Sequence, residues 1–476
     1  MFLSKYIWGL NMTIEKQLLQ GVLLITPPVF ADNRGWFTES YTQYKFAENG
    51  IPAKFIQDNH SYSTQKGVLR GIHFQRDPKA QSKLVRCTRG AILDVAVDLR
   101  RGSDTYGKSV VVELSAENYK QLFIPKGFGH GFVTLTDDVE VQYKVDEYYS
   151  KEHDGGIRFD DPELDIDWGV GNPILSEKDT KLPLLKDAAP GFGLRVLVTG
   201  VNGQLGYDVI KQLETLGLTA KGVDIEDFDI TDKNQVRDYL TSWMPDAVVH
   251  CAAYTAVDKA EDEKEKCSDI NIEGTRNIAE VCRDLDAKMI YISTDYVFDG
   301  KGKDPHQEDA PPAPINYYGY SKEAGERIVR ELVERYFIIR TSWVYGKNGT
   351  NFVKTMLQLA GKRKSLTVVD DQIGSPTYTR DLANLICDML QTRKYGTYHG
   401  VNEGYCSWYE FACEIFRKEG VDVTVTPVPS EAYPTKAKRP VNSRLGKKLL
   451  VQNGFNRLPD WQDALDRYLS ELKEDA

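Results

Sequence analysis

The chain of 476 residues is too long for a single hydrophobic core, and its length predicts roughly two to four domains. Its composition, 41% hydrophobic and 27% charged, is that of a globular protein. The formal net charge of −10 excludes the basic field that nucleic acid or an anionic membrane surface would need.

The cysteines and the hydropathy of the chain indicate its cellular compartment and whether it crosses a membrane. The seven cysteines contain no CxxC pair, so we predict reduced packing residues in a cytoplasmic protein. No apolar run reaches the roughly 18 residues of a membrane span. We therefore expect neither a membrane nor a nucleic-acid partner. Residues 1–12 are expected to be an N-terminal extension, and the sequence leaves open whether translation starts at Met1 or Met12.

Short strands separated by turn residues are predicted up to about residue 160. In Ala91–Leu99 apolar residues alternate with Asp94 and Asp98, a period of two that is typical of a half-buried antiparallel strand. Many such strands at even spacing predict an all-β sandwich or jelly roll. The expected strands are Gly21–Ile25, Trp36–Tyr41, Val68–Phe74, Lys83–Cys87, Ala91–Leu99, Ser109–Leu114, Gln121–Pro125 and Val139–Val145.

This β-rich part also carries several groups that can transfer protons. They are Arg70 and His73 in RGIH, Lys83, His130 in GFGHGF and the aromatic cluster at 143–149. Histidines in a jelly roll suggest a metal-binding cupin, but that site needs an HxH pair with a glutamate. RGIHFQ offers one histidine and no second ligand two residues on, so we predict no metal.

Several stretches of this part resemble dTDP-4-dehydrorhamnose 3,5-epimerase over about residues 13–187. They include DNRGWFTESY, QDNHSYS, GVLRGIHFQ, QSKLVRCTRG, LSAENYKQLFIPKGFGHGF, QYKVDEYYS and LSEKD. The resemblance implies a cupin-like jelly roll over residues 13–180. It also implies a dTDP-sugar substrate, no metal requirement, and a homodimer formed through this domain.

The resemblance also assigns roles around a sugar with a C4 ketone, which acidifies the protons at C3 and C5. His73 would remove a proton as the base, Asp179 would orient its imidazole, and Tyr143 would return a proton on the opposite face. Lys83 would stabilise the enolate charge on the C4 oxygen. Tyr149 would stack on thymine, and Asp154 stands where the family usually has Glu. The implied substrate contacts are Arg34, Glu39, Gln57, Asn59, Arg70, His130, Tyr149, Asp154 and Lys178.

Residues 181–193, KLPLLKDAAPGFG, are predicted to be a linker, and the spacing of apolar residues changes after it. From Leu194 onwards apolar strands such as LRVLVTG and MIYIST alternate with helical spacing. This alternation predicts βαβ units on a parallel sheet, an α/β Rossmann fold over residues 194–476.

A glycine-rich element follows the first of these strands. Gly200, Gly203 and Gly206 form GxxGxxG between a predicted strand and a predicted helix, which suits the pyrophosphate of a dinucleotide. Asp224 follows 18 residues after Gly206, at the end of the next strand. A carboxylate there can accept hydrogen bonds from the adenosine ribose and would repel a 2′-phosphate.

Further along, Tyr318 and Lys322 form a YxxxK step that places both side chains on one helix face. We expect Lys322 to lower the pKa of Tyr318, so that the phenol can exchange a proton with a sugar oxygen near neutral pH. Thr294, at the end of MIYIST, is expected to hydrogen-bond the same oxygen.

From about Leu194 to the C-terminus the chain resembles dTDP-4-dehydrorhamnose reductase, an extended short-chain dehydrogenase with a small substrate-binding subdomain. The resemblance rests on VTGVNGQLG, HCAAYTAVDKAE, NIEGTRNIA, YISTDYVFDG, YYGYSK, RTSWVYG, DQIGSPTYTRDLA and KRPVNSRL. It implies that Tyr318 donates the proton, with Lys322 and Thr294 as its partners, and that Thr255 and Trp343 lie near the substrate. The implied cofactor contacts are Gly203, Gln204, Leu205, Asp224, Asp229 and Ala253, beside Gly200, Gly206, Tyr318 and Lys322.

The run Ser293-Thr294-Asp295-Tyr296 separates this part from related dehydratases, which carry an Asp-Glu pair. Tyr296 stands in the Glu position, so the acid for elimination is absent and net reduction is favoured. The cofactor is NADPH or NADH: Asp224 favours NADH, whereas the nearby Lys221 leaves NADPH open.

Together the two parts predict a bifunctional enzyme that makes dTDP-L-rhamnose. The first part would epimerise dTDP-4-dehydro-6-deoxy-D-glucose at C3 and C5, and the second would reduce the C4 ketone. Two alternatives stay open. The same chemistry can give another 6-deoxy-L-hexose nucleotide, such as the L-talose form. Alternatively, the second part is a non-catalytic nucleotide-sugar-binding module, like the regulatory subunit of methionine adenosyltransferase.

Overall fold

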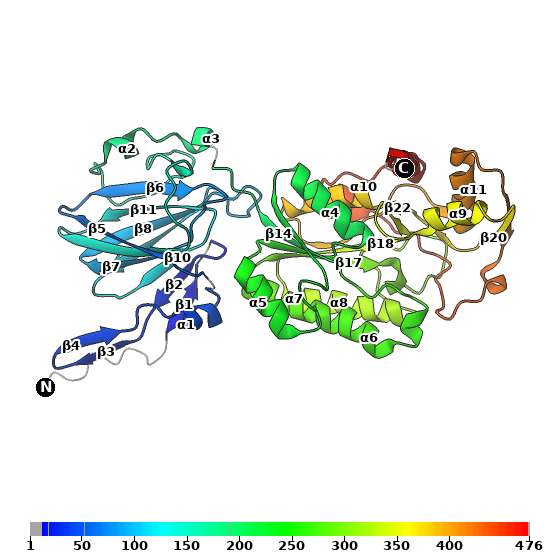
Figure 1. Ribbon diagram of the computed structural model, residues 1–476, viewed down its shortest axis with the longest axis horizontal. Coiled ribbons are helices and arrows are strands. Elements are labelled where there is room, and N and C mark those ends of the chain that lie inside the picture. The colour runs from blue at the N-terminus through cyan, green and yellow to red at the C-terminus, as the bar shows by residue number, and fades with distance from the viewer. Residues whose placement is uncertain (1–11, 18, 52, 189, 475–476) are drawn as a thin grey trace. The chain divides into compact units, whose positions relative to one another are not determined.

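The computed structural model describes residues 12–17, 19–51, 53–188 and 190–474 (Figure 1). The chain divides into two compact units, Met1–Leu194 and Arg195–Ala476. The predicted N-terminal extension, apart from Met12, lies outside the described residues. No helix among the described residues is long and apolar enough to cross a membrane.

The first unit is built from two antiparallel sheets (Figure 1). The six-stranded sheet has the order β1 (Thr13–Lys16), β2 (Leu23–Thr26), β10 (Gln121–Ile124), β7 (Lys83–Arg89), β12 (Val139–Val145) and β5 (Gln57–Ser63). The five-stranded sheet has the order β13 (Asp154–Gly156), β6 (Leu69–Gln75), β11 (Phe128–Thr134), β8 (Ala91–Asp98) and β9 (Ser109–Ser115). A separate hairpin is formed by β3 (Val29–Asp32) and β4 (Gly35–Thr38), and the short helices are α1 (Gln43–Glu48), α2 (Glu177–Thr180) and α3 (Leu185–Ala188).

The main core of this unit lies between the two sheets. Val85 and Leu122 of one sheet pack in a single buried cluster with Ile92 and Phe132 of the other. A second cluster lies on the opposite face of the five-stranded sheet, where Trp168 and other residues of the 157–192 segment are buried. This segment includes the stretch predicted as a linker, whose Leu185, Ala188 and Phe192 are all buried.

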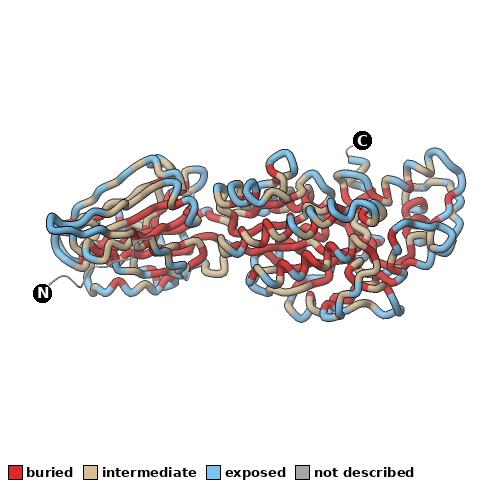
Figure 2. Tube along the Cα trace, turned by 90° about the horizontal axis from the view of Figure 1, so that it is seen from below, coloured by how far each residue is buried: buried red, intermediate tan, exposed pale blue. Residues whose placement is uncertain are grey.

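Each of the predicted strands overlaps a strand of the structure, but β8 is not half-buried as predicted. Asp94 and Asp98 are fully buried on the face that points to the other sheet, and Val95 and Val97 are buried on the opposite face. The reason is the 157–192 segment, which covers the face that a two-layer sandwich would leave in water. Figure 2 shows the buried strands in red within this unit.

The second unit has a six-stranded parallel sheet with helices on both faces (Figure 1). Its order is β15 (Thr219–Val223), β14 (Arg195–Thr199), β16 (Ala247–His250), β17 (Lys288–Thr294), β18 (Tyr336–Thr341) and β23 (Gly396–His399). One face carries α5 (Lys233–Trp243), α7 (Thr275–Asp284) and α8 (Tyr317–Leu332), and the other carries α4 (Gln204–Thr215) and α10 (Thr379–Leu390). Because β15 and β16 flank β14 on opposite sides, the strand order reverses at β14, where sheets of this kind bind ligands.

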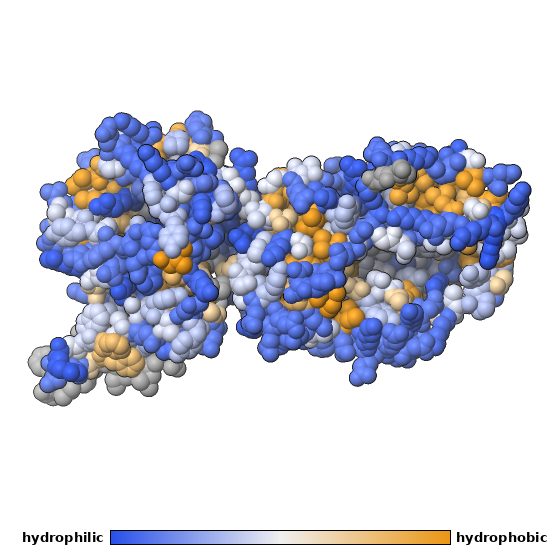
Figure 3. All heavy atoms as spheres, in the orientation of Figure 1, coloured by the Kyte–Doolittle hydropathy of each residue, from blue (hydrophilic) through white to orange (hydrophobic). Residues whose placement is uncertain are grey.

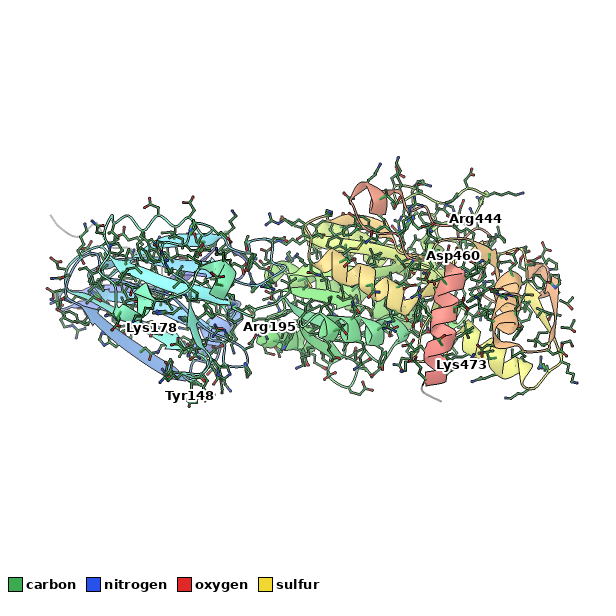
Figure 4. The ribbon with its side chains drawn as sticks, turned by 90° about the horizontal axis from the view of Figure 1, so that it is seen from above. Tyr148, Lys178, Arg195, Arg444, Asp460 and Lys473 are labelled. Atoms are coloured by element: carbon green, nitrogen blue, oxygen red, sulfur yellow. The ribbon has the colours of Figure 1, made fainter. Side chains whose placement is uncertain are left out.

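A smaller region beside the sheet has its own core. It contains α9 (Phe352–Ala360), β20 (Ser365–Val369), α11 (Trp408–Glu419), β25 (Thr424–Val428) and α13 (Trp461–Glu474). Figure 4 labels Asp460 and Lys473 at the two ends of α13, and Figure 3 shows apolar residues at the surface over α9 and α11. The other elements of the second unit are α6 (Lys264–Ser268), a π-helical turn at Asp269–Gly274, β19 (Val344–Tyr345), β21 (Ile373–Gly374), β22 (Thr377–Tyr378), β24 (Cys406–Ser407), α12 (Lys448–Gln452) and short 3-10 helices at Lys259–Glu261, Asp295–Val297 and Ser430–Ala432.

Candidate active sites

A bulge in β6 brings two predicted site residues to the same face. Arg70 and His73 are three residues apart, so a regular strand would point them in opposite directions. Here His73 pairs with His130, and Arg70 pairs with Phe132, only two residues along β11. The extra residue in β6 returns both side chains to the inner face.

The bulge depends on Gly71, which has φ +120°. A Cβ there would lie 2.5 Å from the Cα of Gly131 and 2.7 Å from the carbonyl oxygen of His130. We expect Gly71→Ala to lower the unfolding free energy of the first unit by about 3 kcal/mol or more, because both the φ value and the contact are unfavourable. Thermal unfolding measures this change.

Gly171→Ala is the matched control, since that glycine has open space around it and a φ outside the left-handed region. We expect its unfolding free energy to stay within about 0.5 kcal/mol of the parent. Equal stability of the two variants would refute the steric account of the bulge.

A cavity of about 470 Å³ in the first unit is lined by residues of both sheets and of α2. Seven predicted site residues line it: Arg70, His73, Lys83, His130, Tyr143, Lys178 and Asp179. Histidine, lysine, tyrosine and aspartate thus surround one space, which is the set that proton transfer beside a carbonyl needs.

His73 and Asp179 form a close pair at this cavity. Nε2 of His73 lies 2.6 Å from Oδ1 of Asp179, and the other carboxylate oxygen accepts a hydrogen bond from the hydroxyl of Ser176 at 2.8 Å. Ser176 also caps α2, so the helix start fixes the carboxylate. Burial opposes ionisation of Asp179, but the hydrogen bond and charge of His73 outweigh it and hold the pKa of Asp179 below its usual value. An ionised Asp179 orients the ring and leaves Nδ1 as its proton acceptor.

Tyr143 and Lys83 lie on the sheet that faces His73. Tyr143 is on β12, and burial raises its pKa, so the phenol keeps its proton at neutral pH. Lys83 is on β7, and burial lowers its pKa to about 8, although the charges of Asp94 and Asp154 oppose this. A proton donor and a cation therefore lie across the cavity from the base.

His130 is held by a buried carboxylate that the sequence did not indicate. Its Nε2 lies 2.8 Å from Oδ1 of Asp94, and burial lowers the pKa of His130. Within the described part of the chain, Oδ2 of Asp94 has no hydrogen-bond partner. Strand alternation alone could not identify Asp94, because it placed this residue on a solvent-exposed face.

The other predicted substrate contacts of this unit fall into three groups. Asn59 pairs with Tyr143 across β5 and β12 and therefore shares its face, and Gln57 donates a hydrogen bond to Asn59 at 2.9 Å. Lys178, labelled in Figure 4, donates to Asp154 at 2.5 Å, and the hydroxyl of Tyr149 lies 3.4 Å from the same carboxylate.

Arg34 and Glu39 are not brought to this cavity. Arg34 is in the turn of the β3–β4 hairpin and pairs with Asp32 at 2.6 Å, and Glu39 pairs with Lys45 at 2.7 Å. Both ion pairs are exposed to solvent.

The glycine element of the second unit forms a tight loop between β14 and α4. Gly200 has φ +68°, and a Cβ on Gly206 would lie 2.3 Å from the carbonyl oxygen of Gly200. Gly203 caps α4, so the amides of the helix start point at the loop. Leu205 is buried, and the side-chain oxygen of Gln204 accepts from the amide of Gly346 at 2.9 Å.

A cavity of about 450 Å³ lies beside this loop and includes Gly200, Asp224, Asp229 and Ala252 among its lining residues. Asp224 follows β15 directly and accepts a hydrogen bond from the amide of Asn202 at 2.9 Å. Asp229 accepts from the amide and hydroxyl of Thr231 at 2.8 Å. Ala253 follows Ala252 in the chain, after β16. The cavity therefore lies at the carboxyl ends of the strands, where the strand order reverses.

Tyr318 lies close to Thr294 at the carboxyl end of β17. Tyr318 is in the first turn of α8, and Thr294 is the last residue of β17. The hydroxyl of Thr294 donates to Oδ1 of Asp295 at 3.0 Å and is also a hydrogen-bond partner of Tyr318. Burial raises the pKa of Asp295 to about 6. The sequence pattern indicates no separate role for Asp295, which stands next to Tyr296 in the run that distinguishes reductases from dehydratases.

The prediction that Lys322 lowers the pKa of Tyr318 is wrong for this arrangement. Burial raises the pKa of Tyr318, and the charge of Asp295 raises it further. The ammonium of Lys322 lies 4.2 Å from the centroid of the Tyr291 ring, and burial lowers the pKa of Lys322 to about 7. Desolvation affects both groups more than their mutual attraction does.

The pKa of Lys322 predicts a pH effect on reduction. A lysine with this pKa carries its charge below about pH 7 and loses it above, so kcat/KM for sugar reduction is expected to fall as the pH rises through about 7. Lys322→Arg should remove this inflection from the residual activity, because arginine stays charged. Steady-state rates on the already epimerised sugar measure it, and a flat wild-type profile through neutral pH would contradict the role of Lys322.

Trp343 and Thr255, the two predicted substrate contacts of the second unit, differ in their exposure to solvent and in their contacts. Trp343 has φ +49° and stacks on Trp408 with centroids 3.7 Å apart, so its ring is fixed. Thr255 is exposed in the segment that follows β16.

Comparison with known proteins identifies the two parts. Residues 16–187 match the family model described as dTDP-4-dehydrorhamnose 3,5-epimerase, and residues 194–474 match the RmlD substrate binding domain. The dTDP-4-dehydrorhamnose 3,5-epimerase of Shigella flexneri is 52% identical over 169 residues, which are 35% of this chain and 93% of that protein. The dTDP-4-dehydrorhamnose reductase of Escherichia coli is 40% identical over 293 residues, covering 59% of this chain and 98% of that protein.

A solved structure agrees with the second match. The dTDP-4-dehydrorhamnose reductase of Bacillus anthracis, in complex with NADP, is 46% identical with a TM-score of 0.58, covering 58% of this chain and 99% of that one. The chain therefore belongs to the dTDP-4-dehydrorhamnose 3,5-epimerase family in its first part and to the dTDP-4-dehydrorhamnose reductase family in its second.

Proposed function

We propose that this chain converts dTDP-4-dehydro-6-deoxy-D-glucose to dTDP-L-rhamnose in two steps, epimerisation followed by reduction. The observation that carries the proposal is the presence of both sets of chemical groups in one polypeptide. A base and a proton donor face one cavity in the first unit, and the second unit carries Thr294 at the end of β17, Tyr318 and Lys322 on α8, and a glycine loop between β14 and α4.

The first step exchanges protons beside the C4 ketone. His73, held by Asp179, removes a proton from C3 or C5, and the charge that develops on the C4 oxygen is stabilised by Lys83. Tyr143 returns a proton from the opposite sheet. Delivery from the face opposite the base inverts the carbon centre, which is the outcome an epimerase needs.

The remaining contacts of the first unit position the nucleotide and the sugar. We assign Gln57, Asn59, Arg70, His130, Asp154 and Lys178 to this task, with Tyr149 stacking on the base. Tyr149 is 60% exposed and so is available for stacking. No metal enters this mechanism.

The residues around the glycine loop fit a reduced nicotinamide dinucleotide. A Cβ at Gly206 would close the approach to the loop, the start of α4 offers free amides, and Asp224 suits a ribose. When bound, NADPH or NADH supplies the hydride for C4. Tyr318 donates the proton to the C4 oxygen, Thr294 hydrogen-bonds that oxygen, and Lys322 supplies a positive charge.

The fold assignments follow from the same resemblance. We propose that the first unit is a jelly roll of the cupin type over residues 13–180. The second is an extended short-chain dehydrogenase over residues 194–476, with the smaller region around α9 and α11 as its substrate-binding subdomain. We assign residues 181–193 as the connection between them.

We also propose a homodimer through the first unit. The β3–β4 hairpin forms a two-stranded sheet of its own, and its Phe30, Trp36 and Phe37 are 48%, 56% and 68% exposed. An isolated hairpin is only marginally stable in water, so we expect a second copy of the chain to pack over these rings. Arg34 and Glu39 of the hairpin region would then contact substrate only in the dimer.

We expect Phe37→Asp to convert dimers into monomers in sedimentation velocity, because it puts a charge into an apolar interface. Tyr106→Asp changes an exposed aromatic residue outside the hairpin and should leave the dimer intact. A monomeric parent protein at micromolar concentration would contradict the proposed assembly.

The bifunctional proposal is tested by following the absorbance of reduced nicotinamide with the un-epimerised keto-sugar. We expect oxidation of NADPH or NADH only when the sugar is present. Absence of oxidation with both cofactors, while an authentic epimerised sugar is also left unreduced, would show that the second unit is a binding module.

A further inference from the structure

The carboxyl end of β15, beside the glycine loop, is the place where the chain can distinguish NADH from NADPH. The two dinucleotides differ only in a phosphate on the 2′ oxygen of the adenosine ribose, which adds roughly two negative charges at neutral pH. In folds of this kind a carboxylate after the second strand binds the free 2′-hydroxyl, whereas a nearby arginine accommodates the 2′-phosphate. The residues that follow β15 therefore decide which cofactor fits.

Asp224, the first residue after β15, has a carboxylate that backbone amides hold in place. Its Oδ2 accepts from the amide of Asn202 in the glycine loop at 2.9 Å, and its Oδ1 accepts from the amide of Ile225 at 2.9 Å. Turning the side chain away would break both hydrogen bonds. Each carboxylate oxygen can accept a second hydrogen bond, so a ribose hydroxyl can still donate to it. A 2′-phosphate at the same place would instead meet a fixed negative charge.

The residues after Asp224 add carboxylates and no cation. Positions 222–232 read GVDIEDFDITD, which contains five acidic residues and neither lysine nor arginine. Ile225 lines the cavity directly after Asp224 and is 61% exposed. An arginine at this position could reach a 2′-phosphate, but isoleucine brings no charge. Glu226 is exposed, and its Oε2 lies 3.5 Å from the side-chain nitrogen of Asn202, so a second carboxylate lies beside the loop.

Two lysines are near enough in the chain or the cavity to matter for a phosphate. Lys221 left NADPH open in the sequence, but its Nζ lies 4.8 Å from the centroid of the Tyr239 ring on α5, and it does not line the cavity. Lys266 does line the cavity, but Asp269, three residues further along, lines it too and offsets its charge. The described charged residues of the lining are thus one lysine against three aspartates, Asp224, Asp229 and Asp269.

We propose that this chain uses NADH in preference to NADPH, and that Asp224 and Ile225 set the choice. Asp224 accepts from the ribose hydroxyls of NADH and repels the 2′-phosphate of NADPH, while Ile225 occupies the position from which a cation could bind that phosphate. This inference rests on the proposed reduction, because it names the hydride donor for that step. The solved reductase of Bacillus anthracis holds NADP, so NADPH is the alternative that the experiment has to exclude.

Titration calorimetry of the full chain with NADH and with NADPH measures the preference without any sugar. We expect the Kd of NADH to be lower than that of NADPH by about tenfold or more, because like charges beside Asp224 oppose the phosphate. The double variant Asp224→Ser, Ile225→Arg should reverse the order and bind NADPH more tightly. Equal affinities in the parent chain, or tighter binding of NADPH, would overturn the inference.

Two further variants separate this account from a general effect of charge. Leu216→Arg places the same new charge on a residue that is 45% exposed and outside the cavity lining, and it should keep the parental ratio of affinities. Lys221→Ala should keep that ratio as well, because Lys221 packs on Tyr239. A selective loss of NADPH affinity in Lys221→Ala would make Lys221 a phosphate ligand and contradict the proposal.

Steady-state kinetics with the already epimerised sugar gives a second reading. We expect kcat/KM for NADH to exceed that for NADPH by about tenfold or more in the parent chain, and the double variant should invert the ratio. If the parent binds NADH more tightly but oxidises neither cofactor, the preference stands and the proposed reduction fails. If it oxidises both with equal kcat/KM, the reduction stands and the preference fails.

Discussion

Replacing Tyr318 by Phe is expected to lower sugar-dependent nicotinamide oxidation by about 10²–10⁴-fold, the range lost when a general acid is removed. The variant keeps the ring that packs against Tyr296 and loses only the hydroxyl. Burial and Asp295 raise the pKa of this phenol, so we expect it to hold its proton until the C4 oxygen becomes basic during hydride transfer.

Tyr320→Phe is the matched control, because Tyr320 is on the same helix and is exposed. It should oxidise nicotinamide at the parental rate. Proton exchange at C3 and C5 should continue in both variants, since those groups belong to the first unit. Parental rates of nicotinamide oxidation in Tyr318→Phe would mean that another group supplies the proton.

Replacing His73 by Ala is expected to slow solvent deuterium entry at C3 and C5 by about 10²–10⁴-fold. The variant lacks the imidazole that Asp179 orients, and this imidazole is the proposed base. Reduction of an already epimerised sugar should be unaffected. Asp179→Asn should also slow deuterium entry, though less, since the ring keeps a hydrogen-bond partner but loses the charge that stabilises its protonated form.

His60→Ala controls for loss of an imidazole. His60 is on β5 of the same unit, but its side chain is 52% exposed and pairs with Glu140. Deuterium entry should match the parent. The assignment of His73 fails if His73→Ala exchanges deuterium as fast as His60→Ala does.

Local patterns in the sequence were sufficient for much of the fold. The glycine loop was predictable because its spacing and its flanking strand and helix are all local. Strands such as β8 and β12 were predictable because their apolar residues alternate. In contrast, β5 and β11 were not predicted. β5 reads QDNHSYS and is polar on both faces, and β11 reads FGHGFVT, which is buried on both faces. β5 therefore lacks the apolar alternation by which a strand is recognised.

For the site residues too, the sequence indicates their identity, whereas their arrangement depends on tertiary structure. His73, Asp179, Tyr143 and Lys83 were indicated by family resemblance, but their grouping depends on the β6 bulge and the capped start of α2. The burial of Asp94 depends on the packing of one sheet on the other, and the raised pKa of Tyr318 depends on desolvation. Each of these is a tertiary effect that no single stretch of sequence encodes.

Joining the two activities has a chemical rationale. The epimerised product keeps its C4 ketone and can therefore epimerise back, whereas reduction removes the ketone and ends the exchange. A covalent connection raises the effective concentration of the second catalyst near the first.

The most direct test of the account is NMR analysis of the product formed in deuterated water from dTDP-4-dehydro-6-deoxy-D-glucose with both reduced cofactors. We expect dTDP-L-rhamnose that carries deuterium at C3 and C5 and a cofactor-derived hydrogen at C4. A 6-deoxy-L-talose nucleotide would contradict the proposed product, from which it differs only in the configuration at C4. A reduced sugar without deuterium at C3 and C5 would contradict the order of epimerisation before reduction.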